Sequence, residues 1–341
     1  MVENVMITTR YYYEKLNERE KKIYKAIYTG IMQYKQYVEV PEVNLHDNNV
    51  GWVYHCVLWD NPFIFSVGEY AMRHAVSDDK SKIKMTTLCD AETERKYRKQ
   101  IEAEVNKILS VPGLQNMTDF QKEVFVHDFI INNIKYENSN DKSNIQPYTV
   151  YGALVEHKAV CEGIAKTVKL LLNLLDVKCI VVSGKYDGNE HAWNIVKLND
   201  WSYNLDVTMD MGKVLHPGMM RYNYFNFRNS DIPDYEPDNL QMIPDCKAIE
   251  YNYIIKAAGF VSNYERLKRY IENGLKKKKS CLYFKINRNV DDQFTNLSFI
   301  EFQELVSKAY GEVANAMKLN TSRFVDSTGP NEIVSMEITY E

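Results

Sequence analysis

The sequence predicts an α+β fold, and its middle third carries the strongest signals. Apolar side chains recur at helical spacing after Cys161, which predicts an amphipathic helix over residues 161–175 with one buried face. The β-branched run 178–184 follows as an expected strand. Two further β-like segments, 191–198 and 201–208, are separated only by a short polar turn, which predicts an antiparallel hairpin. A helix that packs on an antiparallel sheet follows from this order.

The segments before residue 115 predict a helical and β extension that packs on this core. Asn17 and Glu20 form a capping box that begins a helix, and Thr118 with Gln121 begins another in the same way. The helix after Thr118 places His127 on its apolar face, where a hydrogen-bonded core histidine is expected. The other elements expected here are a strand at 52–57, strands at 70–76 and 82–88, and a charged helix at 91–109.

The segments after residue 229 predict a linker and a small C-terminal α+β module. Residues 230–244 contain three prolines and several acidic residues, which favours a connecting loop. The module's expected elements are helices at 263–278 and 298–318 and strands at 280–286 and 332–340. We therefore expect three parts: the extension 1–114, a core 115–235 and the module 246–341.

Cys161 stands at the predicted start of a helix, a position that favours a reactive thiol. The unpaired amides of the first turn and the positive end of the helix dipole both favour a thiolate over a thiol there. The other cysteines lie mostly in apolar or β-like runs that are typical of buried side chains. No C-x-x-C pair occurs, so neither a zinc site nor a disulfide framework is expected.

The predicted hairpin brings a histidine and an aspartate together. Pairing Leu198 with Trp201 puts His191, Trp193 and Asp206 on one face and an apolar set on the other. In this register His191 and Asp206 are diagonal neighbours within hydrogen-bonding reach. A thiol, an imidazole and a carboxylate in this order indicate nucleophilic acyl transfer.

These residues resemble the transglutaminase-like superfamily in its bacterial form. The resemblance lies in Val-Cys-Glu-Gly at 160–163, His-Ala-Trp-Asn at 191–194 and Leu-Asp-Val-Thr at 205–208, and it covers roughly residues 115–230. It implies a papain-like core in which Cys161 is the nucleophile, His191 the base and Asp206 the orienting carboxylate. An oxyanion hole is expected to combine the Cys161 amide with an upstream donor, for which Tyr151 is favoured over Gln146. Trp193 is a candidate substrate contact.

Three functions fit this site. A cysteine protease or amidase would resolve the Cys161 thioester with water. A transglutaminase would resolve the same thioester with an amine acceptor and so crosslink proteins. A binding module would retain the triad without using it. We favour hydrolysis, because the sequence shows no calcium-loop spacing and no sign of a second channel for an amine.

Composition bounds the partners and the location. The net charge of −4 argues against a nucleic-acid partner, and no apolar run is long enough to span a membrane. The expected partner is a protein or peptide substrate, and no metal or other cofactor is expected. The start of the chain has no signal-like apolar region, so a cytoplasmic location is expected, or a secreted or cell-surface one if a leader has been removed.

Overall fold

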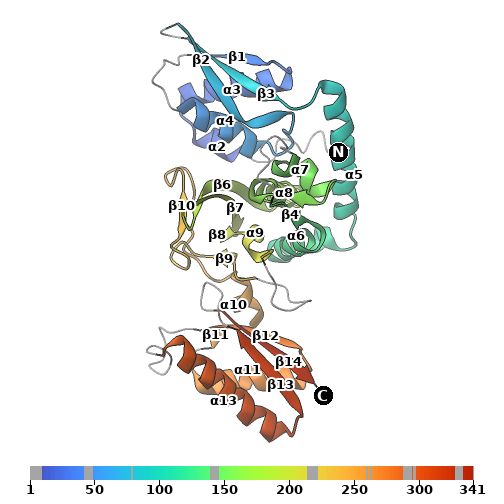
Figure 1. Cartoon of the computed structure of the whole chain (residues 1–341), viewed down its shortest axis with the longest axis vertical. Coiled ribbons are helices and arrows are strands. Elements are labelled where there is room, and N and C mark those ends of the chain that lie inside the picture. The colour runs from blue at the N-terminus through green and yellow to red at the C-terminus, as the bar shows by residue number, and fades with distance from the viewer. Residues whose placement is uncertain are drawn as a thin grey trace. The chain divides into compact units, whose positions relative to one another are not determined.

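The computed structural model describes most of the chain (Figure 1). It contains helices and antiparallel sheets, which confirms the predicted α+β class. The chain divides into two compact units, each described separately below. Unit 1 comprises Met1–Met211 and Asp234–Asp245, and unit 2 comprises Gly212–Pro233 and Cys246–Glu341. The described residues are 10–41, 49–77, 80–138, 146–212, 222–258, 260–261, 263–286, 294, 297–326 and 333–340.

Unit 1 is centred on helix α8 (Cys161–Leu174), which packs on strands β6 (Lys178–Tyr186) and β7 (Asn189–Leu198). Ile164, Val168 and Leu171 are almost fully buried, so the predicted apolar stripe forms the core face of this helix. Strand β8 (Trp201–Leu205) pairs with β7, and β10 (Tyr235–Pro237) pairs with β6. These strands are all antiparallel in the order β10-β6-β7-β8.

Short helices and strands lie around the start of α8. The two-residue strands β4 (Lys135–Tyr136) and β5 (Lys158–Ala159) pair in parallel just before the helix. The predicted capping box at Thr118 is present and begins α6, which confirms that prediction. The other elements of this part are α6 (Asp119–Asn133), η2 (Gln146–Tyr148), α7 (Val150–Leu154) and α9 (Val207–Asp210).

The N-terminal extension shares a hydrophobic core with this sheet. Tyr12 and Trp59 belong to a buried cluster that also contains Ala165 and Val181, and the Tyr12 hydroxyl donates to the Val181 carbonyl at 2.5 Å. The extension and the core thus lie in one compact unit, while the predicted domain limits at 114 and 235 stay predictions. The extension consists of α2 (Tyr11–Lys15), α3 (Glu18–Met32), β1 (Tyr37–Pro41), α4 (Asn49–Asp60), β2 (Val67–Ser77), β3 (Lys80–Thr87), α5 (Ala91–Leu109) and η1 (Leu114–Asn116).

The structure corrects the predictions for residues 52–57 and 230–244. Residues 52–57 lie in helix α4 and not in a strand. Their β-branched and aromatic side chains suit a strand, but α4 is buried on almost every side, and such a helix shows no polar face in its sequence. The segment 230–244 is not a simple linker, because it contains β10. Pro237 is tolerated there since it lies at the end of an edge strand.

Unit 2 contains a mixed sheet and two long helices. Strands β12 (Cys281–Ile286) and β14 (Ile333–Tyr340) and helices α11 (Tyr264–Lys276) and α13 (Phe299–Met317) confirm the four elements predicted for the module. The core of the module includes Leu267, Phe284, Val306 and Met336. The sheet order is β11-β12-β14-β13, and the elements that the sequence did not predict are β9 (Phe225–Phe227), α10 (Tyr253–Ala258), β11 (Phe260–Val261) and β13 (Thr321–Asp326).

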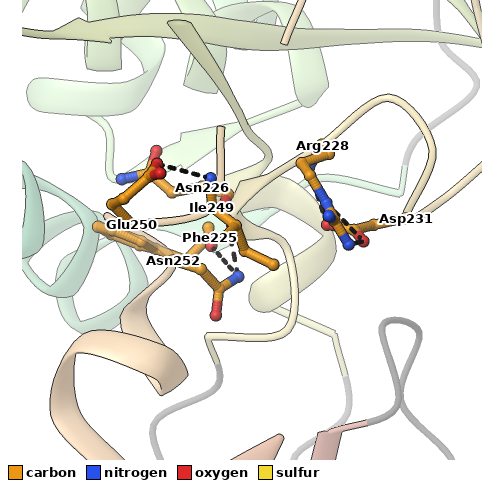
Figure 2. A network of polar contacts seen from close by, with 7 residues as sticks. All are labelled: Phe225, Asn226, Arg228, Asp231, Ile249, Glu250 and Asn252. Atoms are coloured by element: carbon orange, nitrogen blue, oxygen red, sulfur yellow. Dashed lines mark hydrogen bonds and ion pairs between the residues drawn. The ribbon is translucent and has the colours of Figure 1, made fainter. Parts of the chain in front are cut away.

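A buried asparagine pair ties the two segments of unit 2 together (Figure 2). The Asn252 side-chain amide donates to the carbonyls of Phe225 at 3.0 Å and Asn226 at 3.3 Å. The Asn226 amide in turn donates to the Tyr251 carbonyl at 3.0 Å. Both asparagines are fully buried, so these bonds satisfy backbone groups that would otherwise be costly to bury. Residues 222–233 are held to the module by this network.

Within the described residues, we find no helix long and apolar enough to cross a membrane.

Candidate active site

Cys161 is the first residue of α8 and its side chain is partly exposed. Val160 is the N-cap residue and offers no side-chain acceptor, so the amides of the first turn remain unsatisfied by a cap. Cys161 also packs against the hydrophobic cluster of the N-terminal extension. The prediction that Cys161 stands at the start of a helix is therefore confirmed.

The hairpin that carries His191 has the predicted register up to its end. Leu198 pairs with Trp201, as expected. The second strand, expected over 201–208, ends at Leu205, because Thr208 lies in helix α9. Asp206 ends the strand and caps this helix, with Oδ1 accepting the Met209 amide at 3.0 Å. Aspartate is a favoured N-cap residue, which explains why the strand stops there.

His191 and Asp206 nevertheless meet as the sequence predicted. His191 Nε2 lies 2.5 Å from Asp206 Oδ2. The Tyr235 hydroxyl donates to the same oxygen at 2.6 Å. With Met209, Asp206 thus receives bonds from three groups while its side chain is only 1% exposed. The carboxylate is held in one orientation against the imidazole.

Tyr235 was missed by the sequence analysis and depends on one glycine. It lies on β10, where it pairs with Tyr186. A Cβ at Gly184 would lie 2.2 Å from the Glu236 carbonyl oxygen, closer than any real contact. Glycine at 184 therefore allows β10 to approach β6 and deliver Tyr235 to Asp206.

The Cys161 thiol lies close enough to His191 to contribute to the pKa of its imidazole. Because Asp206 occupies Nε2, Nδ1 is the ring nitrogen left for the sulfur. Burial opposes protonation of His191, but the charge and hydrogen bond of Asp206, followed by the interactions with Cys161, raise its pKa to about 10. The protonated form of the His191 imidazole is therefore favoured at neutral pH.

Aromatic rings enclose His191. The Trp193 ring stacks on it at 6.2 Å, and the Tyr186 and Tyr235 rings lie at 6.0 and 6.2 Å. Trp193 is 1% exposed, and its indole donates to Asn204 at 3.1 Å. The structure does not support the expected substrate contact of Trp193, because a buried ring offers no free face. Trp193 instead packs behind the imidazole.

Tyr136, which the sequence analysis did not name, lies close enough to Cys161 to interact with it. It ends strand β4, opposite Ala159 and close to Cys161 in the fold. Burial, and then the charges of Cys161 and Asp206, raise the pKa of Tyr136 to about 12. No sequence signal pointed to Tyr136, because it depends on pairing between two strands of only two residues each.

The described contacts of Tyr151 and Gln146, the two expected oxyanion donors, are with residues other than Cys161. The Tyr151 ring stacks on Tyr97 of α5 at 4.0 Å and is 8% exposed. The Gln146 amide is complementary to the Glu156 carboxylate. These contacts give both residues a packing or bonding role, and their oxyanion role stays a prediction.

The other described cysteines of unit 1 have thiols whose pKa is raised. Cys56 and Cys179 are buried, and burial raises the pKa of each thiol well above its usual range. Burial and then Glu94 raise the pKa of Cys89 to about 11. Among the residues that the structure describes, no three or more histidine, cysteine or acidic side chains gather as metal ligands would.

His127 is fully buried on α6, which confirms the prediction of a core histidine. Its Nδ1 lies 2.9 Å from Asp128 and its Nε2 lies 3.2 Å from Asp210. Both ring nitrogens are therefore occupied by carboxylates, and none is left to serve a nucleophile.

Comparison with known families agrees with the resemblance in the sequence. Residues 112–206 match the sequence model of the Transglutaminase-like superfamily, and this span contains Cys161, His191 and Asp206. The segment is therefore a transglutaminase-like domain within an α+β protein. No curated protein matches the chain.

Several solved structures are similar to the chain. One is a TGase (TM-score 0.31, 14% identity, 55% of this chain and 54% of that chain covered). Another is a candidate cysteine protease from Cytophaga hutchinsonii (TM-score 0.26, 12% identity, 41% and 61% covered). A third is a candidate protease from Parabacteroides distasonis (TM-score 0.22, 12% identity, 41% and 35% covered). The chain spans about half the length of the first of these, and the domain assignment rests on the family match.

Proposed function

We propose that the protein is a cysteine acyl-transfer enzyme that cleaves amide or peptide bonds through a thioester at Cys161. One observation carries the proposal: a buried carboxylate holds Nε2 of the His191 imidazole, which also interacts with the Cys161 thiol. This arrangement matches what nucleophilic acyl transfer requires of its nucleophile, base and orienting group. The family match supports the same class of chemistry.

In this proposal the Cys161 sulfur attacks the substrate carbonyl carbon, and His191 holds the proton of the thiol. The C–N bond then breaks, and His191 gives that proton to the departing amine. Water attacks the thioester in the second half, with His191 taking a proton from the water and returning it to the sulfur. Asp206 keeps one tautomer of the neutral imidazole and stabilises the protonated form. Tyr235 and the Met209 amide fix Asp206 throughout.

A transglutaminase is the alternative within the same chemistry, since an amine could attack the thioester in place of water. The family match supports this alternative as well, because both reactions begin with the same step, the formation of an acyl-enzyme at the cysteine. A binding module on the same scaffold is the third candidate, and it predicts no turnover at all.

A partition experiment separates the three functions. Glutamine-containing and other peptide substrates are incubated with the protein, with and without a fluorescent primary amine, and products are analysed by mass spectrometry. We expect a free acid or a cleaved peptide in both cases, and Cys161→Ala as the matched control gives neither. Amine incorporation in place of hydrolysis supports the transglutaminase. No product and no adduct on Cys161 would contradict both enzymatic functions.

A further inference from the structure

A buried ion pair lies one residue away from the proposed nucleophile. Lys166 pairs with the Glu162 carboxylate across one turn of α8, and both residues are almost fully buried. Glu162 directly follows Cys161 in the first turn of the helix. A carboxylate at this place suits the helix, because it interacts with the positive end of the helix dipole. The same negative charge opposes the formation of a thiolate on the neighbouring residue.

Lys166 is held where it can balance this charge. Its Nζ also donates to the Tyr148 carbonyl of η2 at 3.4 Å. The segment η2 lies directly against the start of α8, since a Cβ at Gly163 would lie 2.2 Å from the Pro147 carbonyl oxygen. The ammonium group is therefore fixed between the Glu162 carboxylate and the backbone of η2.

Lys166, and not the nearby histidine of α4, supplies the positive charge of this pair. His55 interacts with both members of the pair and with Asp238, but burial is the largest influence and lowers its pKa, so that its imidazole is neutral at pH 7. The sulfur itself lies near His191 of β7 and Tyr136 of β4, which are the same in every variant described below.

We propose that Lys166 is a positioning residue that cancels the charge of Glu162 and so allows the Cys161 sulfur to ionise and react. This inference rests on the function proposed above, because the thiolate is the reactive form of a nucleophilic cysteine. Lys166 acts through Glu162 and not on the substrate. A purely structural ion pair is the alternative, and a buried pair can often be replaced by neutral side chains without loss of stability. The two roles are therefore separable by experiment.

Removing one or both charges of the pair tests the proposal. In Lys166→Met the Glu162 charge loses this partner, so alkylation of Cys161 by iodoacetamide at pH 7 should slow roughly tenfold. In the double variant Glu162→Gln/Lys166→Met both charges are gone, and the rate should return to within about threefold of wild type. Lys166→Arg keeps the charge and should keep the rate. At alkaline pH all variants should reach one shared plateau, which a change of structure at Cys161 would not produce.

The matched control is Lys276→Met, because Lys276 forms an ion pair of the same i,i+4 type with Glu272 on α11 of unit 2. This variant changes the net charge equally and should leave the alkylation rate at Cys161 unchanged. Rates are followed by mass spectrometry of the Cys161 peptide and are compared per folded molecule. An unchanged rate in Lys166→Met, or a double variant as slow as Lys166→Met, overturns the inference.

Glu162→Gln keeps the test decisive if Lys166→Met does not fold. Removing the negative charge should speed the alkylation of Cys161 at pH 7, because the Lys166 charge then acts on the sulfur alone. A slower or unchanged rate in Glu162→Gln overturns the inference.

An activated acyl ester separates this inference from the proposed function. Acylation of wild-type Cys161 by the ester tests the function, whereas the alkylation rates test the ion pair. If the ester does not acylate Cys161 while alkylation follows the charges, the proposed acyl transfer is wrong and the charge pairing holds. If wild type is acylated but alkylation is the same in all variants, only the inference about Lys166 is wrong.

Discussion

In the described part of unit 1, His191 and His127 each pair with an aspartate of helix α9. Asp206, its N-cap, bonds His191, while Asp210, its last residue, bonds His127. Both aspartates are 1% exposed. In both pairs burial opposes protonation of the histidine, and the carboxylates outweigh it and raise the histidine pKa. Burial and a raised pKa therefore do not by themselves identify a reactive group.

The second ring nitrogen distinguishes the two pairs. In His127 it bonds another carboxylate, Asp128, and the side chain is sealed from solvent. In His191 it is left for the Cys161 thiol, and the side chain keeps 9% exposure. One pair can exchange a proton with a nucleophile, whereas the other can only hold helix α6 to α9. The difference predicts opposite consequences for matched substitutions.

The largest effect is expected for the two histidines. His191→Ala removes the proton carrier, so kcat/KM for acyl transfer should fall roughly 10³-fold, within the range for general acid–base catalysis. His127→Ala should leave kcat/KM per folded molecule within about tenfold. The measurement is a rate assay corrected for the folded fraction of each variant. Equal losses in both would show that the two pairs do not differ in function.

The two aspartates sharpen the comparison, because each can be changed to a residue of the same shape. Asp206→Asn keeps an N-cap for α9 but no longer fixes the tautomer of His191, so turnover should fall roughly 10²-fold or more. Asp210→Asn should instead lower the free energy of unfolding by about 1.5–3 kcal/mol, because it removes the charge from a buried hydrogen bond to His127. Urea unfolding alongside the rate assay tests both. The account is wrong if Asp210→Asn is the less active of the two.

The pH dependence of stability gives a third contrast. The folded pKa of His191 is raised from 6.5 to about 10, so its contribution to stability is fully present below about pH 6.5 and is lost as the pH rises towards 10. We expect wild type to lose on the order of 2 kcal/mol more than His191→Gln over this range. Urea midpoints measured at half-unit steps of pH check this. Parallel curves for the two proteins would contradict the raised pKa.

The smallest effect is expected for Tyr235, which supports Asp206 from the neighbouring strand. Tyr235→Phe removes one hydrogen bond to the carboxylate, and the rate should fall about three- to tenfold. Tyr186→Phe, which keeps its ring against His191, is the control and should change the rate less. Steady-state kinetics separates the two, and identical rates in both variants would remove Tyr235 from the site.

Local sequence signals predicted the parts of the site that lie close together in the chain. The helical spacing after Cys161 and the alternation along the hairpin were sufficient to predict the helix start at Cys161 and the bond between His191 and Asp206. Tyr136 and Tyr235 escaped prediction because separate chain segments bring them to the site through short strand pairings. Such pairings leave no periodicity in the sequence. Helix α4 was misread for a related reason, since burial on nearly all sides removed its polar face.

The central claim is that Cys161 and His191 act as one unit while His127 stands apart. Histidine-selective NMR titration of wild type and Cys161→Ala tests it directly, without any substrate. Because Cys161 helps to raise the pKa of His191, removing its sulfur should lower that pKa, and the titration of His127 should stay unchanged. A His191 titration that is the same with and without the sulfur would contradict the account.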